Sequence, residues 1–259
     1  MLRSPLRWVG GKSRLRAEIL KRFPPHTCYV EVFCGAGWVL FGKEAETSKV
    51  EIINDIDGEL INFYRVLKHR PAEFAEQFHL ELVSRQLFNE YRRFEEGKTE
   101  LERAMRFYYV MRLCFGGKRE QRTFGTGTVH MPGELNLSRI YFVAHQYSGR
   151  LERVVIENLS WQKCIQIYDR PHTFFYLDPP YPSTQKGMYA RMSWEQHAAL
   201  AEVLHRVQGK FLLSYQDHPR IRRLYRGRGL KTERLPVTYH LGSKSGHGRR
   251  THELLIRNF

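Results

Sequence analysis

The stretch YVEVFCGAGWVLF, residues 29–41, holds an apolar run, a turn with two glycines and the start of a helical pattern. Glycine at positions 35 and 37 permits backbone conformations that other residues rarely adopt, and it lets a ligand approach the main chain. The helix that follows presents its N-terminal amides at the same point. This order predicts the opening unit of an α/β fold, with a small-molecule site at the end of its first strand.

Further short apolar runs along the chain predict buried strands, and helical patterns lie between them. The predicted strands are 28–33, 50–53, 154–157, 174–177 and 210–215, and the helical patterns include 12–23, 58–69 and 193–207. Strands that alternate with helices predict a mainly parallel sheet with helices on both faces. The sequence therefore favours a Rossmann-like α/β domain.

The alternation stops between residues 71 and 150, where helical patterns at about 71–94 and 99–114 precede the glycine-rich, basic run FGGKREQRTFGTGTVHMPGE. About 80 residues inserted between strands predict a separate module. We therefore expect a catalytic domain from 1–70 and 151–259, and an inserted, mainly helical domain at 71–150. The loop at 116–133 is unusually long, and its side chains suit phosphates, base edges or a wedge between bases: Lys118, Arg119, Arg122, His130 and Phe124.

Charge points to a polyanionic partner, because the chain carries a net charge of +15 and its pI is about 9.8. Nucleic acid is the commonest such partner, although solubility alone explains part of an excess of this kind. Ten Lys and Arg residues stand against two acids at 217–250. We assign phosphate contacts there to Lys244, Arg249 and Arg250.

Several classes of protein are disfavoured. The chain has no apolar run near the roughly 20 residues that a membrane span needs, and its first residues lack the apolar core of a signal peptide. Its four cysteines show no CxxC spacing, so we expect reduced thiols, a cytoplasmic protein and no metal site.

Two glycine motifs fail as nucleotide sites. GGKS at 10–13 resembles the end of a P-loop, but Leu6 stands where the first glycine belongs and no strand precedes it. A dinucleotide fingerprint would need a third glycine where Leu40 stands. Asp55 follows the next strand, where a carboxylate can accept hydrogen bonds from both ribose hydroxyls. The expected cofactor is a nucleoside without a pyrophosphate.

The stretch FFYLDPPYPST, residues 174–184, ends a predicted strand on an acid and two prolines. Such a strand can simply stop at a turn, because proline cannot continue a ladder of hydrogen bonds. Alternatively, Asp178 and the Pro179 carbonyl form a rigid pair of acceptors with Tyr181 beside them. The stretch alone leaves both interpretations open.

Taken together, RWVGGK, EVFCGAG, NDID followed by ELINFYRVLK, and LDPPY resemble the Dam-like DNA adenine-N6 methyltransferases, in the motif order of their alpha group. The resemblance implies S-adenosylmethionine as cofactor, double-stranded DNA as substrate and 71–150 as the sequence-reading domain. It places the target adenine at Asp178, Pro179 and Tyr181. It assigns the cofactor contacts to Trp8, Lys12, Phe33, Gly35, Gly37 and Asp55, with Asp178 at their border.

The chain departs from this family pattern at three positions. Val32 stands where proline is common, and Asp57 stands where NDIN would have asparagine. Ser160 stands where the family often has an acid that accepts from the adenine amino group of the cofactor. We therefore expect a weaker hydrogen bond to the cofactor at Ser160.

The resemblance also implies a chemistry for LDPPY. Asp178 would accept one N–H of the adenine amino group and the Pro179 carbonyl the other, which makes the nitrogen a better nucleophile. No covalent enzyme nucleophile is needed, and Tyr181 would offer a stacking face to a base flipped out of the duplex.

The alternatives are a methyltransferase for RNA adenine or cytosine N4, and a catalytically silent DNA-binding protein with the same fold. Asp rather than Ser before PPY favours adenine, and intact Asp55 and Asp178 argue against a silent protein. We expect no membrane and no obligate protein partner, and a place in a bacterial cytoplasm or, for a phage protein, that of its host.

Overall fold

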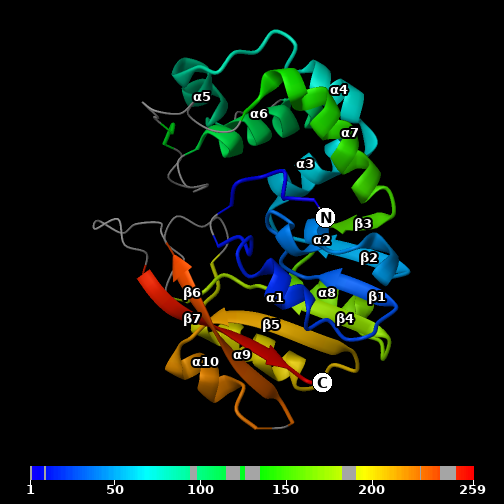
Figure 1. Cartoon of the computed structure of the whole chain (residues 1–259), viewed down its shortest axis with the longest axis vertical. Coiled ribbons are helices and arrows are strands. Elements are labelled where there is room, and N and C mark those ends of the chain that lie inside the picture. Colours follow the sequence, from blue (N-terminus) through cyan, green and yellow to red (C-terminus); the bar gives the residue numbers. More distant parts are fainter. Residues whose placement is uncertain are drawn as a thin grey trace.

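A computed structural model of the chain describes residues 2–8, 10–93, 98–114, 123–125, 135–182, 191–227, 229–239 and 249–259, with the backbone alone at 238, 239, 249 and 250. It contains a seven-stranded sheet in the order β3-β2-β1-β4-β5-β7-β6 (Figure 1). The strands are β1 (Cys28–Glu31), β2 (Val50–Asn54), β3 (Val154–Glu157), β4 (Thr173–Leu177), β5 (Lys210–Gln216), β6 (Lys231–Tyr239) and β7 (Arg249–Arg257). The first five are parallel, whereas β7 runs antiparallel to both β5 and β6.

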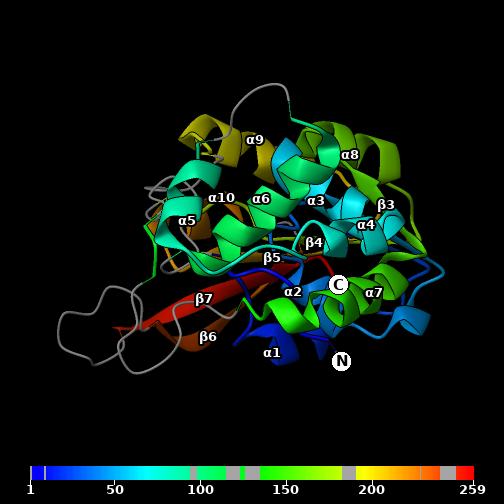
Figure 2. The same cartoon turned by 90° about the horizontal axis from the view of Figure 1, so that it is seen from above.

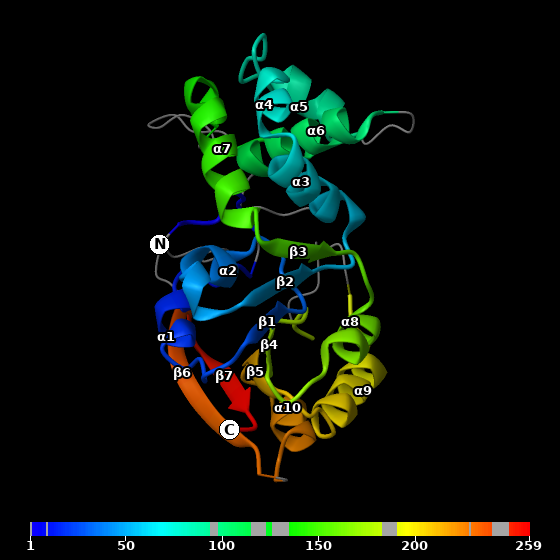
Figure 3. The ribbon, with the colours of Figure 1, turned by 90° about the vertical axis from the view of Figure 1, so that its right-hand side faces the viewer.

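Helices cover both faces of the sheet, as Figure 3 shows. One face carries α1 (Arg16–Leu20), α2 (Trp38–Gly42) and α3 (Gly58–His69), and the other carries α8 (Trp161–Tyr168), α9 (Trp194–Leu204) and α10 (Pro219–Leu224). Because successive side chains of a strand point to opposite faces, Phe174 of β4 packs under the first group and Phe175 under the second. This arrangement confirms the predicted α/β class.

The five predicted strands are all present, and α3 has the predicted bounds. Its N-cap is Asp57, which accepts from Glu59 N and Leu60 N. Ser193 caps α9 in a capping box with Gln196, because each side chain binds the other residue's backbone N–H. The hairpin of β6 and β7 was not predicted from the sequence.

The inserted segment lies at the top of Figure 1 and contains α4 (Pro71–Glu76), α5 (Arg85–Tyr91), α6 (Glu100–Leu113) and α7 (Ile140–Leu151). Short 3-10 helices occur at η1 (Ala45–Thr47) and η3 (Leu137–Arg139). Phe74, Phe107 and Tyr108 pack around Phe63 of α3. The insertion therefore shares one hydrophobic core with α3, whereas a fully separate module would enclose a core of its own. Its role as a sequence-reading domain stays a prediction.

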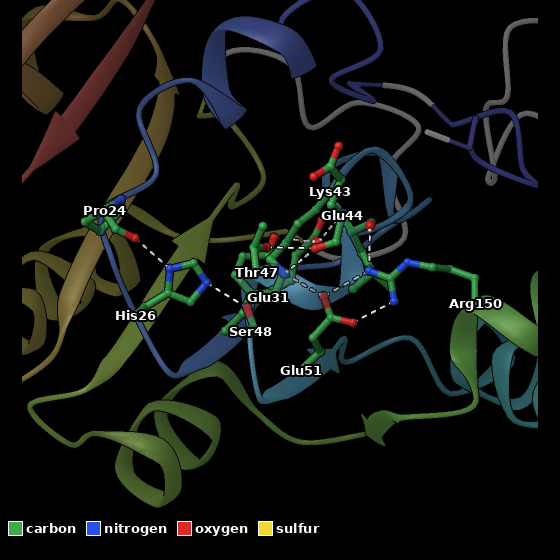
Figure 4. Close-up of polar contacts among 11 residues, drawn as sticks. Pro24, His26, Glu31, Lys43, Glu44, Thr47, Ser48, Glu51 and Arg150 are labelled. Carbon is green, nitrogen blue, oxygen red and sulfur yellow. Dashed lines mark hydrogen bonds and ion pairs between the residues drawn. The ribbon is translucent and has the colours of Figure 1, made fainter.

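A buried ion cluster joins the insertion to the sheet (Figure 4). Arg150, at the end of α7, donates to Glu51 Oε2 at 2.6 Å and to Glu51 Oε1 at 2.9 Å. Lys43 donates to the same carboxylate at 2.8 Å. The side chains of Arg150, Glu51 and Lys43 are 10%, 5% and 2% exposed. A third bond from Arg150, to Leu40 O at 3.0 Å, ties α7 to α2.

Arg150→Ala should lower the free energy of unfolding by about 3 kcal/mol, because breaking a buried ion pair leaves a charge without its partner. Lys43 still binds Glu51 in this variant, which keeps the loss at the low end of the usual range. Urea unfolding gives the value. The control is Arg70→Ala, which removes an exposed pair with Glu73 and should cost less than about 1 kcal/mol. Equal losses in the two variants would contradict the structural importance of the cluster.

Candidate active site

Three strand ends meet at one edge of the sheet. Because β2, β1 and β4 are adjacent and parallel, the residues that follow them lie side by side. Asp55 follows β2, the glycine turn follows β1, and Asp178 follows β4. This carboxyl edge is where open α/β sheets bind ligands.

The glycine turn has the conformations that its sequence predicts. Gly35 and Gly37 have φ of 46° and 64°, in the left-handed region that favours glycine. Gly35 N donates to Asp55 Oδ2 at 2.9 Å, and Gly35 O accepts from the Tyr64 hydroxyl at 2.9 Å. A Cβ at Gly35 would lie 2.9 Å from Trp8 Nε1, so the RWVGGK segment packs directly on the turn.

Asp55 is held by the main chain. Its Oδ1 accepts from Asp57 N at 3.0 Å, while its Oδ2 accepts from Gly35. Asp55 is half-buried, and each oxygen of a carboxylate can accept more than one hydrogen bond, so these two backbone contacts alone do not saturate it. The acid at position 57 has a structural explanation, since Asp57 caps α3.

Ser160 precedes α8 as its N-cap, and its hydroxyl accepts from Lys163 N at 3.3 Å. The loop before it is tied to β2. Asn54 Oδ1 accepts from Leu159 N at 2.9 Å, and Asn158 donates to Asp55 O at 2.8 Å. The two asparagines were not predicted as site residues. Their places within the NDID and ENLS segments were the signal that could have indicated them.

Glu31 supplies the cap that Gly37 cannot, because the residue at the N-cap of α2 has no side chain. Its Oε2 accepts from Leu40 N at 3.0 Å and from the Tyr29 hydroxyl at 2.9 Å. Burial raises the pKa of Glu31 to about 8, and the two hydrogen bonds only partly oppose this effect. The carboxyl that supports the glycine turn is therefore protonated at neutral pH.

This raised pKa makes stability depend on pH below about 8. The folded-state pKa of Glu31 lies above the ordinary value of 4.5, so between these two values the folded state binds more protons than the unfolded state, and stability falls as pH rises. The fall should be at most about 1.4 kcal/mol per pH unit, and it should level off above about pH 8, where Glu31 is ionised in both states. Glu31→Gln should flatten the fall, as measured by urea midpoints at pH 5.5 and pH 8. An unchanged slope in the variant would assign the pH dependence to other groups.

Lys12 and Asp178 form the centre of the site. Lys12 Nζ lies 2.6 Å from both Asp178 oxygens and 3.2 Å from Gly10 O. Lys12 is 5% exposed and Asp178 is 19% exposed. Burial raises the pKa of Asp178, Lys12 counteracts this, and Glu253 adds to it. The GGK motif thus places its lysine on LDPPY, which a P-loop lysine would not do.

Tyr181 is 8% exposed, and its hydroxyl is engaged. It lies 3.1 Å from Asp178 Oδ1 and 2.6 Å from Glu253 Oε2. Lys12 Nζ lies 4.8 Å from the centre of its ring. Tyr181, whose ring is predicted to stack on the flipped base, is therefore also held in place through its hydroxyl. Glu253 was not predicted, although an acid within the apolar strand sequence ELLI was a visible anomaly.

The family model for the D12 class N6 adenine-specific DNA methyltransferases matches residues 8–239. The chain belongs to this family.

Relatives match along most of their length. A DNA adenine methylase of Haemophilus influenzae is 28% identical over 87% of this chain and 84% of its own. The type II methyltransferase M1.LlaDCHI of Lactococcus lactis is 25% identical over all of this chain and 96% of its own. Among solved structures, the rRNA methyltransferase aviRa from Streptomyces viridochromogenes covers 95% of this chain and 84% of its own, at 16% identity and a TM-score of 0.39.

Family membership confirms the predicted activity, that of a site-specific N6-adenine DNA methyltransferase whose substrate is DNA. It disfavours RNA adenine and cytosine N4 as targets. In the part of the chain that the structure describes, no helix is long and apolar enough to cross a membrane, and no His, Cys, Asp and Glu cluster could hold a metal. The four cysteines of this methyltransferase are free and buried.

Two residues before the glycine turn have backbone or packing roles: Val32, where the family pattern has proline, and Phe33, a predicted cofactor contact. Val32 N donates to Tyr176 O at 3.1 Å, a bond that proline in this position could not make. Phe33 is half-buried against the α8 face of the sheet. The bond at Val32 extends the pairing of β1 with β4 beyond the end of β1, up to the turn.

Most of the predicted DNA contacts of the methyltransferase lie outside the described residues: Lys118, Arg119, Arg122, His130 and Lys244. Arg249 and Arg250 pair by backbone with Tyr239 and Thr238 in the β6–β7 hairpin. Phe124 is half-buried against Phe88, with the Arg85 guanidinium 4.7 Å from its ring centre. A wedge role would require Phe124 to leave this packing.

The basic run at 217–250 is partly neutralised from within. Arg222 and Arg234 both bind Asp217, whose side chain is 7% exposed. These two arginines are therefore less available to phosphates than the sequence count suggested.

Proposed function

We propose that this methyltransferase transfers the methyl group of S-adenosylmethionine to N6 of an adenine flipped out of a short duplex DNA site. The observation that carries the proposal is the adjacency of the Gly35–Asp55 contact and the Lys12–Asp178 pair at one edge of the sheet. A methyl donor at the first and an amino group at the second would lie next to each other.

The residues present fit the proposed cofactor. Gly35 and Gly37 give the turn its left-handed conformations, Trp8 offers an indole beside it, and Asp55 offers a carboxylate for a ribose. When bound, S-adenosylmethionine supplies an electrophilic methyl group. Ser160 and the Asn158 loop border the same end of β2, where the cofactor base would lie.

Asp178 and the Pro179 carbonyl would hold the target amino group. Two acceptors for its two N–H groups favour a pyramidal nitrogen, whose lone pair is then available for attack. Pro179 and Pro180 stiffen this pair, and neither supplies a backbone N–H that would compete. Positioning of the two reactants then provides most of the catalysis, by direct displacement.

DNA would approach along the carboxyl edge of the sheet. The β6–β7 hairpin carries Arg249 and Arg250 beyond the end of β5, since β5 ends at Gln216, opposite Glu253. The insertion lies across the other end of the sheet order, next to β3 in Figure 1. Together they would flank a duplex on both sides of Asp178, with the insertion reading sequence and the hairpin binding phosphates.

The test is methylation of a mixed-sequence DNA duplex with S-adenosylmethionine labelled in its methyl group, followed by nucleoside analysis. Label should appear in N6-methyladenine, within one short sequence context. A matched RNA duplex and a cytosine-only target serve as controls. Label in 4-methylcytosine or in the RNA duplex, or no label at all, would overturn the proposal.

Asp55→Ala should weaken cofactor binding by at least tenfold, because a hydrogen bond from a ribose hydroxyl to a charged acceptor contributes about 1.5–3 kcal/mol. Calorimetry with S-adenosylmethionine measures this directly. Asp57→Ala is the comparison, since Asp57 caps α3 and its loss should lower stability more than affinity. Unchanged affinity in Asp55→Ala would place the cofactor elsewhere.

A further inference from the structure

Glu253 is an acid in the interior of the sheet. It lies on β7, opposite Gln216 of β5, and it is 1% exposed. Burying a carboxylate is costly unless hydrogen bonds compensate. One of its partners belongs to the proposed active site, because it accepts from Tyr181 at 2.6 Å, and it also accepts from Ser214 at 3.3 Å.

The Tyr181 hydroxyl lies between two carboxylates but carries only one hydrogen. Its oxygen is 2.6 Å from Glu253 Oε2 and 3.1 Å from Asp178 Oδ1. The shorter distance assigns the hydrogen mainly to Glu253. Asp178 therefore keeps acceptor capacity on Oδ1, which a full hydrogen bond from Tyr181 would occupy.

We infer that Glu253 is a positioning residue of the methyl-transfer reaction, which draws the Tyr181 hydrogen away from Asp178 and so leaves Asp178 free to accept an N–H of the target adenine. This inference rests on the proposed role of Asp178. Glu253 itself touches neither substrate in the proposal, and it acts through the tyrosine.

The charges around Asp178 make this role measurable by pH. The groups that interact with it electrostatically come from the N-terminal segment, β1, β4 with the segment after it, β5 and β7: Lys12, Glu31, Tyr176, Tyr181, Tyr215 and Glu253. The negative charge of Glu253 raises the pKa of Asp178, and the hydrogen bond from Tyr181 lowers it. Removing the charge of Glu253 should therefore move the acidic limb of the pH–rate profile to lower pH, and removing the Tyr181 hydroxyl should move it to higher pH.

Glu253→Gln should lower the single-turnover plateau by about tenfold, because the Tyr181 hydrogen then turns to the remaining charged acceptor, Asp178. The acidic limb should move to lower pH, and cofactor affinity should change by less than about threefold. Tyr181→Phe keeps the ring but leaves the charge of Glu253 without the Tyr181 donor, so its acidic limb should move to higher pH. A merely structural role for Glu253 would lower the plateau of Glu253→Gln without moving its limb.

Tyr168→Phe is the matched control, because Tyr168 also donates to a partly buried glutamate, Glu157, at 2.6 Å. It should leave both the plateau and the limb unchanged. If Glu253→Gln does not fold, the direction of the limb in Tyr181→Phe still decides. The inference is overturned if Glu253→Gln, or failing that Tyr181→Phe, retains the plateau and limb of the parent protein. If Asp178→Ala also transfers methyl groups at the parent rate, the proposed site itself is wrong.

Discussion

Asp178→Ala should reduce the single-turnover rate of methyl transfer by at least about 10²- to 10³-fold, the loss typical of removing one preorganised electrostatic group. In the proposed function Asp178 accepts from the substrate amino group, whereas Asp55 binds the Gly35 turn. The loss should therefore appear in the chemical step, while the affinity for S-adenosylmethionine stays within about threefold. Rapid-quench assays on duplex DNA measure the rate.

Asp178→Asn distinguishes the effect of the negative charge of Asp178 from the effect of its shape. It retains one oxygen acceptor but loses the charge that pairs with Lys12. We expect a rate between those of Asp178→Ala and the parent protein. Asp55→Ala should show the opposite pattern, with a larger loss in affinity for S-adenosylmethionine than in the rate of methyl transfer. If Asp178→Ala keeps a rate within tenfold of the parent, LDPPY is only the end of a strand and a turn.

Lys12→Met should reduce the single-turnover rate at neutral pH by about 10²-fold, because it removes the partner of a buried ion pair. Burial and Glu253 already raise the pKa of Asp178, and Lys12 is the main influence that lowers it. Without Lys12 the pKa rises further, so less of Asp178 is ionised at pH 7. The rate should recover as pH increases.

A pH–rate profile of Lys12→Met distinguishes this effect from misfolding. Lys12→Arg, which keeps the charge, should place the acidic limb nearer that of the parent. Lys21→Met removes an exposed partner of Glu18 and should leave the profile unchanged. A rate loss of equal size at every pH would mean that Lys12 acts on something other than the ionisation of Asp178.

Much of the fold was predictable because its signals are local. The five parallel strands are short apolar runs, and α3 and α9 start at side chains, Asp57 and Ser193, that cap their own helices. The glycines at 35 and 37 adopt positive φ because that turn requires it. The local sequence was enough to predict these features.

Other elements were not predictable from local pattern. The helical pattern at 71–94 breaks into α4 and α5, and its apolar residues join the core of α3 instead of forming their own. The β6 strand, KTERLPVTY, contains charges and a proline, which weaken its strand signal. Pairing with β7 decides its conformation, and that pairing is a tertiary contact.

The candidate site divides in the same way. The sequence by itself determined which residue types stand at the ends of the parallel strands, so Gly35, Asp55 and Asp178 could be named in advance. The tertiary structure decided their partners, because these contacts join distant segments: Lys12 and Asp178 are 166 residues apart, and Tyr181 and Glu253 are 72 apart. A motif specifies its own backbone geometry. The charge beside a buried carboxylate, and with it the pKa and the free acceptor atoms, depends on which remote segments the sheet order brings to the same edge.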